Sequence, residues 1–125
     1  MYDPWEHAEQ LGLSVRYTPS LGTMGLYEHG TIWLLPDMAQ RVERCVLAHE
    51  LSHAVHGDEP TNDRALYARR EQRADREAAR WLISEGDLRR CAQMTDDMGA
   101  WALELDVTGW ILTARLQDIE KENAA

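Results

Sequence analysis

The stretch His49-Glu50-Leu51-Ser52-His53 decides the organisation of this 125-residue chain. Two histidines four residues apart lie on the same face of an α-helix, one turn above the other. This spacing lets both imidazoles reach a single metal ion. It also places Glu50 beside that ion, where the carboxylate can take a proton from a water molecule. The pattern therefore predicts a metal site on a helix, with a general base next to it.

The residues around this stretch favour a helix over residues 38–56. Asp37 is the predicted N-cap, and Gly57 is the predicted stop. Apolar positions recur near helical spacing and form one face, which comprises Val42, Cys45, Val46, Ala48, Leu51 and Val55. His49 and His53 lie at the edge of this face. The alternative is a helix whose two histidines are ordinary surface or core residues, and a third ligand on another element distinguishes the two.

We expect the third ligand from the helical run over residues 64–84, where Glu71 and Asp75 are four residues apart and share a face. Glu71 offers a hard oxygen to a metal already bound by two imidazoles. Asp75 can accept the N–H of one ligating histidine, which fixes the tautomer of that ring. Two nitrogens and one oxygen leave a fourth position open, the arrangement of catalytic rather than structural zinc.

These two segments resemble the ImmA/IrrE family of metallopeptidases, in which H-E-x-x-H is followed by E-x-x-x-D on a second helix, as in gluzincins. The first segment runs from Cys45 to Ala54 and the second from Glu71 to Leu82. In that family the second segment usually reads E-x-x-A-[N/D]-x-F-A-x-x-L-L, and this chain has Glu77 where the pattern has Phe. We expect this departure to affect packing more than the ligands.

The resemblance implies a zinc-dependent endopeptidase with a minimal zincin-like fold. The site residues are then the metal ligands His49, His53 and Glu71, the general base Glu50, and the histidine partner Asp75. It also implies a substrate, a helix-turn-helix repressor of a phage or mobile element, whose cleavage derepresses genes. The alternatives are a non-catalytic, zinc-stabilised adaptor that binds a repressor, and a peptidase of a toxin or immunity system. Two imidazoles and a carboxylate also suit manganese or another first-row divalent ion.

The whole chain predicts an α+β fold in one domain, residues 1–125. Residues 1–36 hold a short helix and three strands, over 13–18, 24–28 and 31–35. We expect these strands to form a short antiparallel sheet packed on the two central helices of residues 37–85. Residues 86–125 then form a helical C-terminal cap. Thr31 to Leu35 is the candidate edge strand for pairing with an extended substrate, and the alternative is a purely structural strand.

Composition limits the partners and the compartment. Thirteen basic and 22 acidic residues give a net charge of −9, which argues against nucleic acid or an anionic membrane as the main partner. No apolar run approaches 18 residues, and Asp3, Glu6 and Glu9 do not suit a signal peptide. We therefore expect a cytoplasmic protein. Cys45 and Cys91 are then reduced thiols, and Cys45 is a small buried residue rather than a ligand.

Two side chains near the predicted ligands have alternative interpretations. Tyr67 lies one turn before Glu71 on the same face, where its hydroxyl either stabilises the oxyanion of a tetrahedral intermediate or packs against a neighbour. His56 lies one turn beyond His53, near the helix end. We expect His56 to interact with the last carbonyls of the helix rather than with the metal.

Residues 102–116 resemble the turn and second helix of a helix-turn-helix. A helix that reads DNA needs basic residues to meet phosphates. The second helix of this segment and the tail after it offer two basic residues against three acidic ones: Arg115 and Lys121 against Asp118, Glu120 and Glu122. We therefore interpret the segment as a packing unit or a protein-docking surface. Trp101 and Trp110 are predicted to lie in the core, and residues 121–125 to fray.

Overall fold

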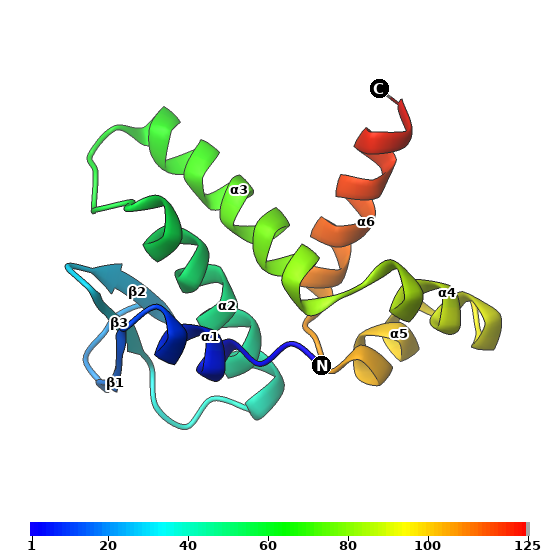
Figure 1. Cartoon of the computed structure of the whole chain (residues 1–125), viewed down its shortest axis with the longest axis horizontal. Coiled ribbons are helices and arrows are strands. Elements are labelled where there is room, and N and C mark those ends of the chain that lie inside the picture. Colours follow the sequence, from blue (N-terminus) through cyan, green and yellow to red (C-terminus); the bar gives the residue numbers. More distant parts are fainter. Residues whose placement is uncertain (125) are drawn as a thin grey trace.

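A computed structural model describes residues 1–124 of the chain as an α+β fold of six helices and three short strands (Figure 1). In chain order the elements are α1 (Pro4–Gln10), β1 (Ser14–Tyr17), β2 (Gly25–Glu28), β3 (Thr31–Leu34), α2 (Gln40–His56), α3 (Arg64–Leu82), α4 (Glu85–Met94), α5 (Met98–Leu105) and α6 (Gly109–Ala124). The predicted fold class is confirmed. The predicted fraying of residues 121–125 is wrong up to Ala124, because α6 continues to that residue, and Ala125 lies outside the described residues.

Helix α2 lies at the centre of the molecule, with the sheet on one side and α3 on the other (Figure 1). Val46, Leu47 and Leu51 pack with the buried residues of α1 and β3. Cys45 and Ala48 join a second cluster formed mainly by α3, α4, α5 and α6. Because α2 is buried on two sides, its polar side chains near the middle share the remaining side, where the site forms.

The ends of α2 test two predicted signals. Gly57 has a φ of 66° and ends the helix in the left-handed conformation, as predicted. The prediction that Asp37 caps the start is wrong. Asp37 lies in a turn with a φ of 64°, and the helix begins at Gln40 after Ala39, which makes no side-chain capping bond.

The sheet is mixed, so the prediction of an antiparallel three-stranded sheet is wrong for one pair of strands. β2 and β3 form the predicted antiparallel hairpin, with Leu26 opposite Trp33. His29 and Gly30 both have positive φ values, as a tight two-residue turn requires. β1 pairs in parallel with the other edge of β3, and the strand order is β1-β3-β2. Sequential neighbours usually pair, but here the crossover places β1 beside the third strand.

This order also changes which strand has a free edge beside α2. Thr31–Leu34 is paired on both sides, so the prediction that it is the edge strand is wrong. The edge strand that contacts α2 is β2. Gly25 permits the close approach, because a Cβ there would lie 2.6 Å from Val46 Cγ1. The free edge of β2 therefore runs along the part of α2 that carries Glu50.

The C-terminal helices complete the second core cluster. Trp101 is buried as predicted, but Trp110 is 41% exposed, so its predicted core position is wrong. Arg115 is buried, and its Nε donates to the Ile83 carbonyl at 2.8 Å. The basic side chain of the segment that resembles a helix-turn-helix is thus part of the packing between α6 and the end of α3.

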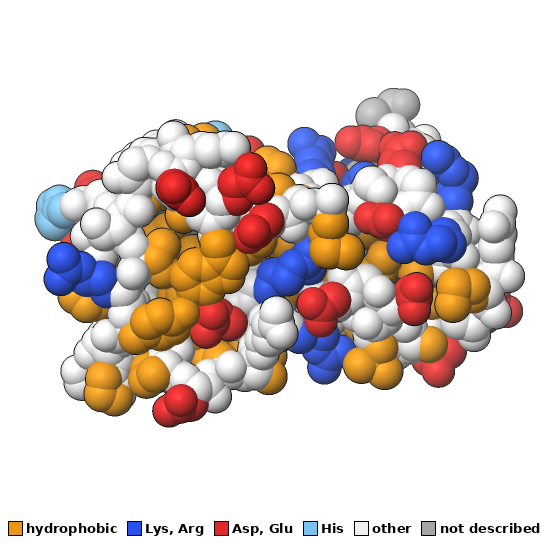
Figure 2. Space-filling model, turned by 60° about the horizontal axis from the view of Figure 1, so that its bottom comes forward, with side chains coloured by type: hydrophobic (Ala, Val, Ile, Leu, Met, Phe, Trp, Pro, Cys, Tyr) orange, Lys and Arg blue, Asp and Glu red, His pale blue; other side chains and the backbone are white. Residues whose placement is uncertain are grey.

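The distribution of charged and hydrophobic side chains on the surface, and the length of the helices, limit which partners are expected. Figure 2 shows one face of the molecule, on which hydrophobic side chains gather over the half that carries the sheet, whereas acidic and basic side chains are mixed over the other half. Among residues 1–124, none of the helices has the length and apolar character needed to cross a bilayer. Cys45 and Cys91 are both buried free thiols.

Candidate metal centre

The two histidines of α2 converge on the carboxylate of Glu71 from α3. The Nε2 atoms of His49 and His53 lie 3.2 Å apart. One oxygen of Glu71 lies 2.9 Å from the Nε2 of His49, and the other oxygen lies 2.9 Å from the Nε2 of His53. The structure thus brings together the three side chains that the sequence predicts as ligands of one metal ion.

Each histidine presents its other ring nitrogen to a second carboxylate. Nδ1 of His49 lies 2.8 Å from Asp75 Oδ1, the contact expected from the sequence. Nδ1 of His53 lies 2.9 Å from Asp58 Oδ2. A carboxylate beside Nδ1 keeps the proton of the neutral ring on that nitrogen, so Nε2 of each ring carries a lone pair.

These donors fit a divalent metal ion. Two lone pairs and a carboxylate directed at one point repel each other unless a cation lies among them. Ligand atoms bound to a tetrahedral zinc ion at roughly 2.0–2.1 Å lie about 3.3 Å from one another, close to the 3.2 Å between the two Nε2 atoms. His49, Glu50 and His53 also form a group whose ligand atoms all lie within 4.8 Å of one another, as a metal site requires.

In the absence of a metal ion, the pKa values of His49 and Glu71 indicate that the cluster attracts positive charge. Burial disfavours the charged ring of His49, but hydrogen bonds with Asp75 and Glu71 outweigh burial and raise its pKa to about 10. Burial also opposes ionisation of Glu71, yet hydrogen bonds from both histidines lower its pKa to about 2. Protons and a metal ion therefore compete for the same nitrogens, and metal binding releases protons.

Glu50 lies beside the three converging side chains but is not one of them. Its Oε1 is 4.0 Å from the Nε2 of His49, farther than the oxygens of Glu71. Only 7% of Glu50 is exposed, and this burial raises the pKa of its carboxyl group, although the charges of both histidines and the backbone of Tyr27 lower it in part. Glu50 therefore lies next to the converging side chains, farther from His49 Nε2 than the oxygens of Glu71.

Asp58 is the site residue that the sequence analysis missed. Gly57 turns the chain back, so that the Asp58 N–H donates to the His53 carbonyl at 2.9 Å and the carboxylate meets the His53 ring. The Asp58 side chain is only 7% exposed, and it pairs with Arg73 and, at 3.3 Å, with Nε of Arg70. An Asp directly after the glycine that ends an H-E-x-x-H helix was the available signal.

Two side chains considered as extra ligands, His56 and Cys45, lie outside the centre. Nε2 of His56 is 3.1 Å from Glu77 Oε1, so His56 contacts a side chain rather than the helix-end carbonyls expected. The Ser52 hydroxyl donates to the same oxygen at 2.9 Å. These contacts explain how Glu77 is accommodated at the position where the family pattern has Phe. The Cys45 thiol accepts from the Thr108 N–H at 3.4 Å, within the core.

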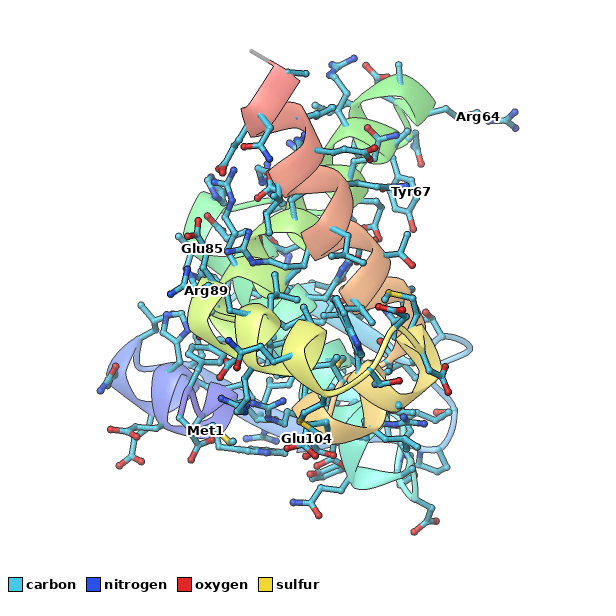
Figure 3. All side chains as sticks on the ribbon, turned by 90° about the vertical axis from the view of Figure 1, so that its right-hand side faces the viewer. Met1, Arg64, Tyr67, Glu85, Arg89 and Glu104 are labelled. Atoms are coloured by element: carbon cyan, nitrogen blue, oxygen red, sulfur yellow. The ribbon has the colours of Figure 1, made fainter. Side chains whose placement is uncertain are left out.

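The centre opens into a cleft of about 400 Å³. Its floor is formed by the α2 and α3 side chains of the site, and its rim by residues 23–26, Tyr67 and Trp110. Tyr67 is 56% exposed and projects from the side of α3 (Figure 3). Tyr67 therefore lines the cleft, and the role of its hydroxyl stays a prediction. The charge of Glu71 raises the pKa of its hydroxyl, so this group is a neutral donor near pH 7.

The fold and the site define a metallopeptidase-type architecture: a helix with H-E-x-x-H, a second helix that supplies a carboxylate, and a small sheet whose edge borders the cleft. The chain belongs to the peptidase family described as the IrrE N-terminal-like domain, whose family model matches residues 8–116. This range includes every residue of the metal centre. No curated protein and no solved structure matches the chain.

Proposed function

We propose that the protein is a zinc-dependent endopeptidase. The observation that carries this proposal is the convergence of His49, His53 and Glu71, each Glu71 oxygen at 2.9 Å from one Nε2 atom. These three side chains hold the ion, with manganese as the alternative metal. Asp75 and Asp58 orient the two imidazoles through their Nδ1 atoms. When bound, the metal supplies Lewis-acid activation of a water molecule and of the scissile carbonyl.

Glu50 acts as the general base in this proposal. Its carboxylate takes a proton from the attacking water and delivers it to the amine that leaves. The position 4.0 Å from His49 Nε2 keeps the carboxylate near the reacting atoms without occupying a ligand position. Tyr67, exposed on the rim of the same cleft, donates a hydrogen bond to the oxyanion that forms from the carbonyl.

The β2 strand holds the substrate in an extended conformation. One edge of β2 pairs with β3, and the other borders the cleft through Gly25 and Leu26. An added strand gains main-chain hydrogen bonds from such an edge. The substrate backbone then passes over Glu50, which β2 approaches most closely at Gly25, where an added Cβ would lie 3.0 Å from Glu50 Cγ.

The proposed substrate is a helix-turn-helix transcriptional repressor of a phage or mobile element, cleaved in the cytoplasm to derepress its genes. Support comes from the resemblance of both site segments to the ImmA/IrrE family and from the family match over residues 8–116. The acidic charge of −9 gives the chain little affinity for the DNA that such a repressor occupies.

Glu50→Gln tests the proposal because it removes the base and keeps the ligands. We expect about one zinc per chain by elemental analysis in both proteins, and loss of metal in Glu71→Ala. Mass spectrometry after incubation with a purified phage-type repressor should show discrete fragments with the wild type. Turnover by Glu50→Gln should fall by roughly two to four orders of magnitude.

Other outcomes of this experiment separate the alternatives. Stoichiometric repressor binding by both proteins without cleavage would support the adaptor. Cleavage of other proteins while the repressor stays intact would overturn the substrate but keep the chemistry. A folded wild type that takes up no zinc or manganese would overturn the metal centre itself.

A further inference from the structure

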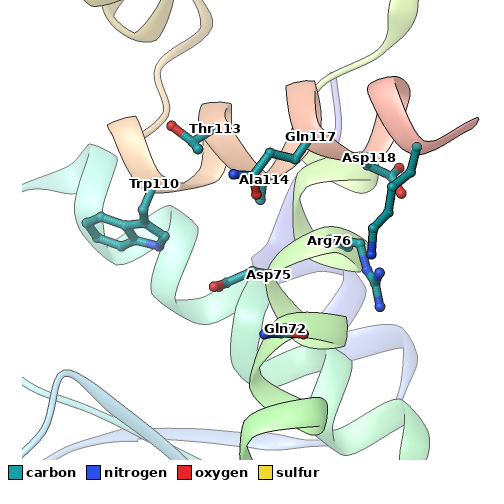
Figure 4. A pocket seen from close by; sticks show the side chains of 9 residues that line it. Gln72, Asp75, Arg76, Trp110, Thr113, Ala114, Gln117 and Asp118 are labelled. Atoms are coloured by element: carbon teal, nitrogen blue, oxygen red, sulfur yellow. The ribbon is translucent and has the colours of Figure 1, made fainter. Parts of the chain in front are cut away.

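A second hollow adjoins the catalytic cleft and lies between α3 and α6. It encloses about 470 Å³, and Asp75 and Trp110 line both this groove and the cleft. Figure 4 shows Gln72, Asp75 and Arg76 on α3 facing the side chains of α6 across the groove. The two hollows therefore adjoin each other, with Asp75 and Trp110 in the walls of both.

The carboxylates of this groove already have cationic or proton-donating partners. Asp75 is 2.8 Å from Nδ1 of His49. Asp118 is buried, and it accepts from Arg80 at 2.5 and 2.8 Å and lies 3.6 Å from Arg115. These partners neutralise most of the negative charge that the groove would otherwise present to a ligand.

The two cationic side chains that line the groove have no such ion-pair partners among the described residues. Within residues 1–124, neither Arg76 nor Lys121 forms an ion pair, whereas Arg70, Arg73 and other arginines do, although Arg76 adds to the positive surroundings of Asp118. The amides of Gln72 and Gln117 also line the groove. The groups left available are therefore two cations and several hydrogen-bond donors, in a chain whose net charge is −9.

We propose that this groove binds an acidic segment of the protein substrate, next to the bond that is cleaved. The proposal rests on the proposed endopeptidase function, because the position of the groove next to the cleft is what places a substrate there. Arg76 and Lys121 pair with carboxylates of that segment, and the glutamine amides donate to its main-chain carbonyls. The half-exposed indole of Trp110 separates this segment from the residues at the metal centre.

A protein segment fits the groove better than a nucleic acid. A phosphate chain carries one charge at every step and is therefore repelled more strongly by a molecule whose net charge is −9. An acidic peptide carries fewer charges, and its neutral main chain suits the glutamines.

Binding of a defined probe tests the proposal without requiring cleavage. The probe is a fluorescein-labelled decapeptide of Gly and Ser with four Glu, and the matched peptide has four Gln. Fluorescence anisotropy with zinc-loaded Glu50→Gln protein at low salt should give a Kd about tenfold lower for the Glu peptide, as two exposed ion pairs would produce. The difference should shrink as salt screens the charges.

Two double variants with the same change in charge locate the effect. Arg76→Gln with Lys121→Gln should abolish the preference for the Glu peptide. Arg64→Gln with Arg69→Gln, at exposed positions of α3 that do not line the groove, should retain it. Equal affinity for both peptides would overturn the proposal, as would equal losses in both variants. Tighter binding of an oligothymidylate of ten nucleotides than of the Glu peptide would instead favour a nucleic-acid ligand and also overturn it.

The same proteins separate this proposal from the peptidase function. If the wild type cleaves nothing but the groove variants lose the Glu preference, the groove stands and the enzyme activity fails. If the wild type cleaves its substrate and the Arg76→Gln, Lys121→Gln variant keeps the same KM, the groove fails and the activity stands. A rise in KM of about tenfold with an unchanged kcat is the result expected when both hold.

Discussion

Each histidine of the candidate metal centre contacts a carboxylate from a different part of the chain, and the two carboxylates are not equivalent. Asp75 comes from α3 and its side chain is 38% exposed, whereas Asp58 comes from the loop after α2 and is 7% exposed. Asp58 also meets Arg70 and Arg73, so His53 is tied through it to α3. This ion-pair network links α3 to the C-terminal end of α2, beside the candidate metal centre.

Asp58→Asn should weaken zinc binding by about 10–100-fold, because the amide holds the Nδ1–H of His53 less firmly and no longer balances the two arginines. Competition with a chromophoric chelator measures the affinity. Glu59→Gln changes the neighbouring carboxylate, which contacts His29 rather than the centre. That variant should bind zinc as the wild type does. Equal affinities for Asp58→Asn and Glu59→Gln would show that Asp58 does not orient the histidine.

Tyr67→Phe should lower kcat by roughly a hundredfold, because it removes a single hydrogen bond to the developing oxyanion. Zinc content should not change, since the hydroxyl is not among the converging ligand atoms. Steady-state kinetics on the cleaved repressor give kcat, and elemental analysis gives the metal. If Tyr67→Phe keeps its full kcat, the tyrosine is only part of the cleft wall.

At the scale of elements, the contact between β2 and α2 determines whether an edge strand can serve the cleft. A glycine stands where the two elements approach most closely, and an added Cβ would meet both Val46 Cγ1 at 2.6 Å and Glu50 Cγ at 3.0 Å. The strand proposed to present its edge to the substrate and the helix that carries Glu50 therefore share one tightly packed contact.

Gly25→Ala should displace β2 from α2 and destabilise the fold by about 1–3 kcal/mol, the usual cost of overpacking. Turnover should fall as well, because the strand edge and Glu50 both move. Chemical denaturation followed by circular dichroism gives the free energy of unfolding. The double variant with Val46→Ala removes the nearer clashing atom, so it should be more stable than the sum of the two single changes predicts. Strict additivity would show that the clash is relieved elsewhere.

Local patterns predicted the helices of the site, and non-local pairing explains most of what they missed. The spacing of His49, His53, Glu71 and Asp75 is a property of single helices, so it could be predicted from the sequence and matches the observed convergence. The position of β1 beside β3 depends on a crossover that no residue pattern specifies. Trp110 looked like a core residue by type alone, but α6 turns it toward the cleft.

At the scale of the whole molecule, an ion pair between the half-exposed Arg80 of α3 and the buried Asp118 of α6 holds the far wall of the groove. Asp118 on α6 meets Arg80 on α3 and Arg115 on its own helix, and its side chain is only 4% exposed. The hydrogen bond with Arg80 lowers the pKa of Asp118 most, and the charges of Arg80, Arg115 and Arg76 lower it further, although burial opposes this. Asp118 thus adds an ion pair to the packing of Ile111 and Leu112 and to the hydrogen bond of Arg115, which also attach the C-terminal helix.

Asp118→Asn should lower the free energy of unfolding near pH 7 by about 1.5–3 kcal/mol, the usual contribution of hydrogen bonds to charged groups. Because the pKa of Asp118 is lower in the folded chain, its stabilisation is complete above the unfolded pKa of roughly 4. It is lost as the pH falls through the folded value. The difference between wild type and variant should therefore shrink below about pH 4 in urea titrations at several pH values.

Glu85→Gln is the control. It removes an exposed pair with Arg89 (Figure 3), 3.8 Å apart, and should change the free energy of unfolding by less than about 0.5 kcal/mol at any pH. A difference for Asp118→Asn that stays constant from pH 7 to pH 3 would mean that the side chain acts through its shape, and that the charge of the carboxylate does not hold α6 in place.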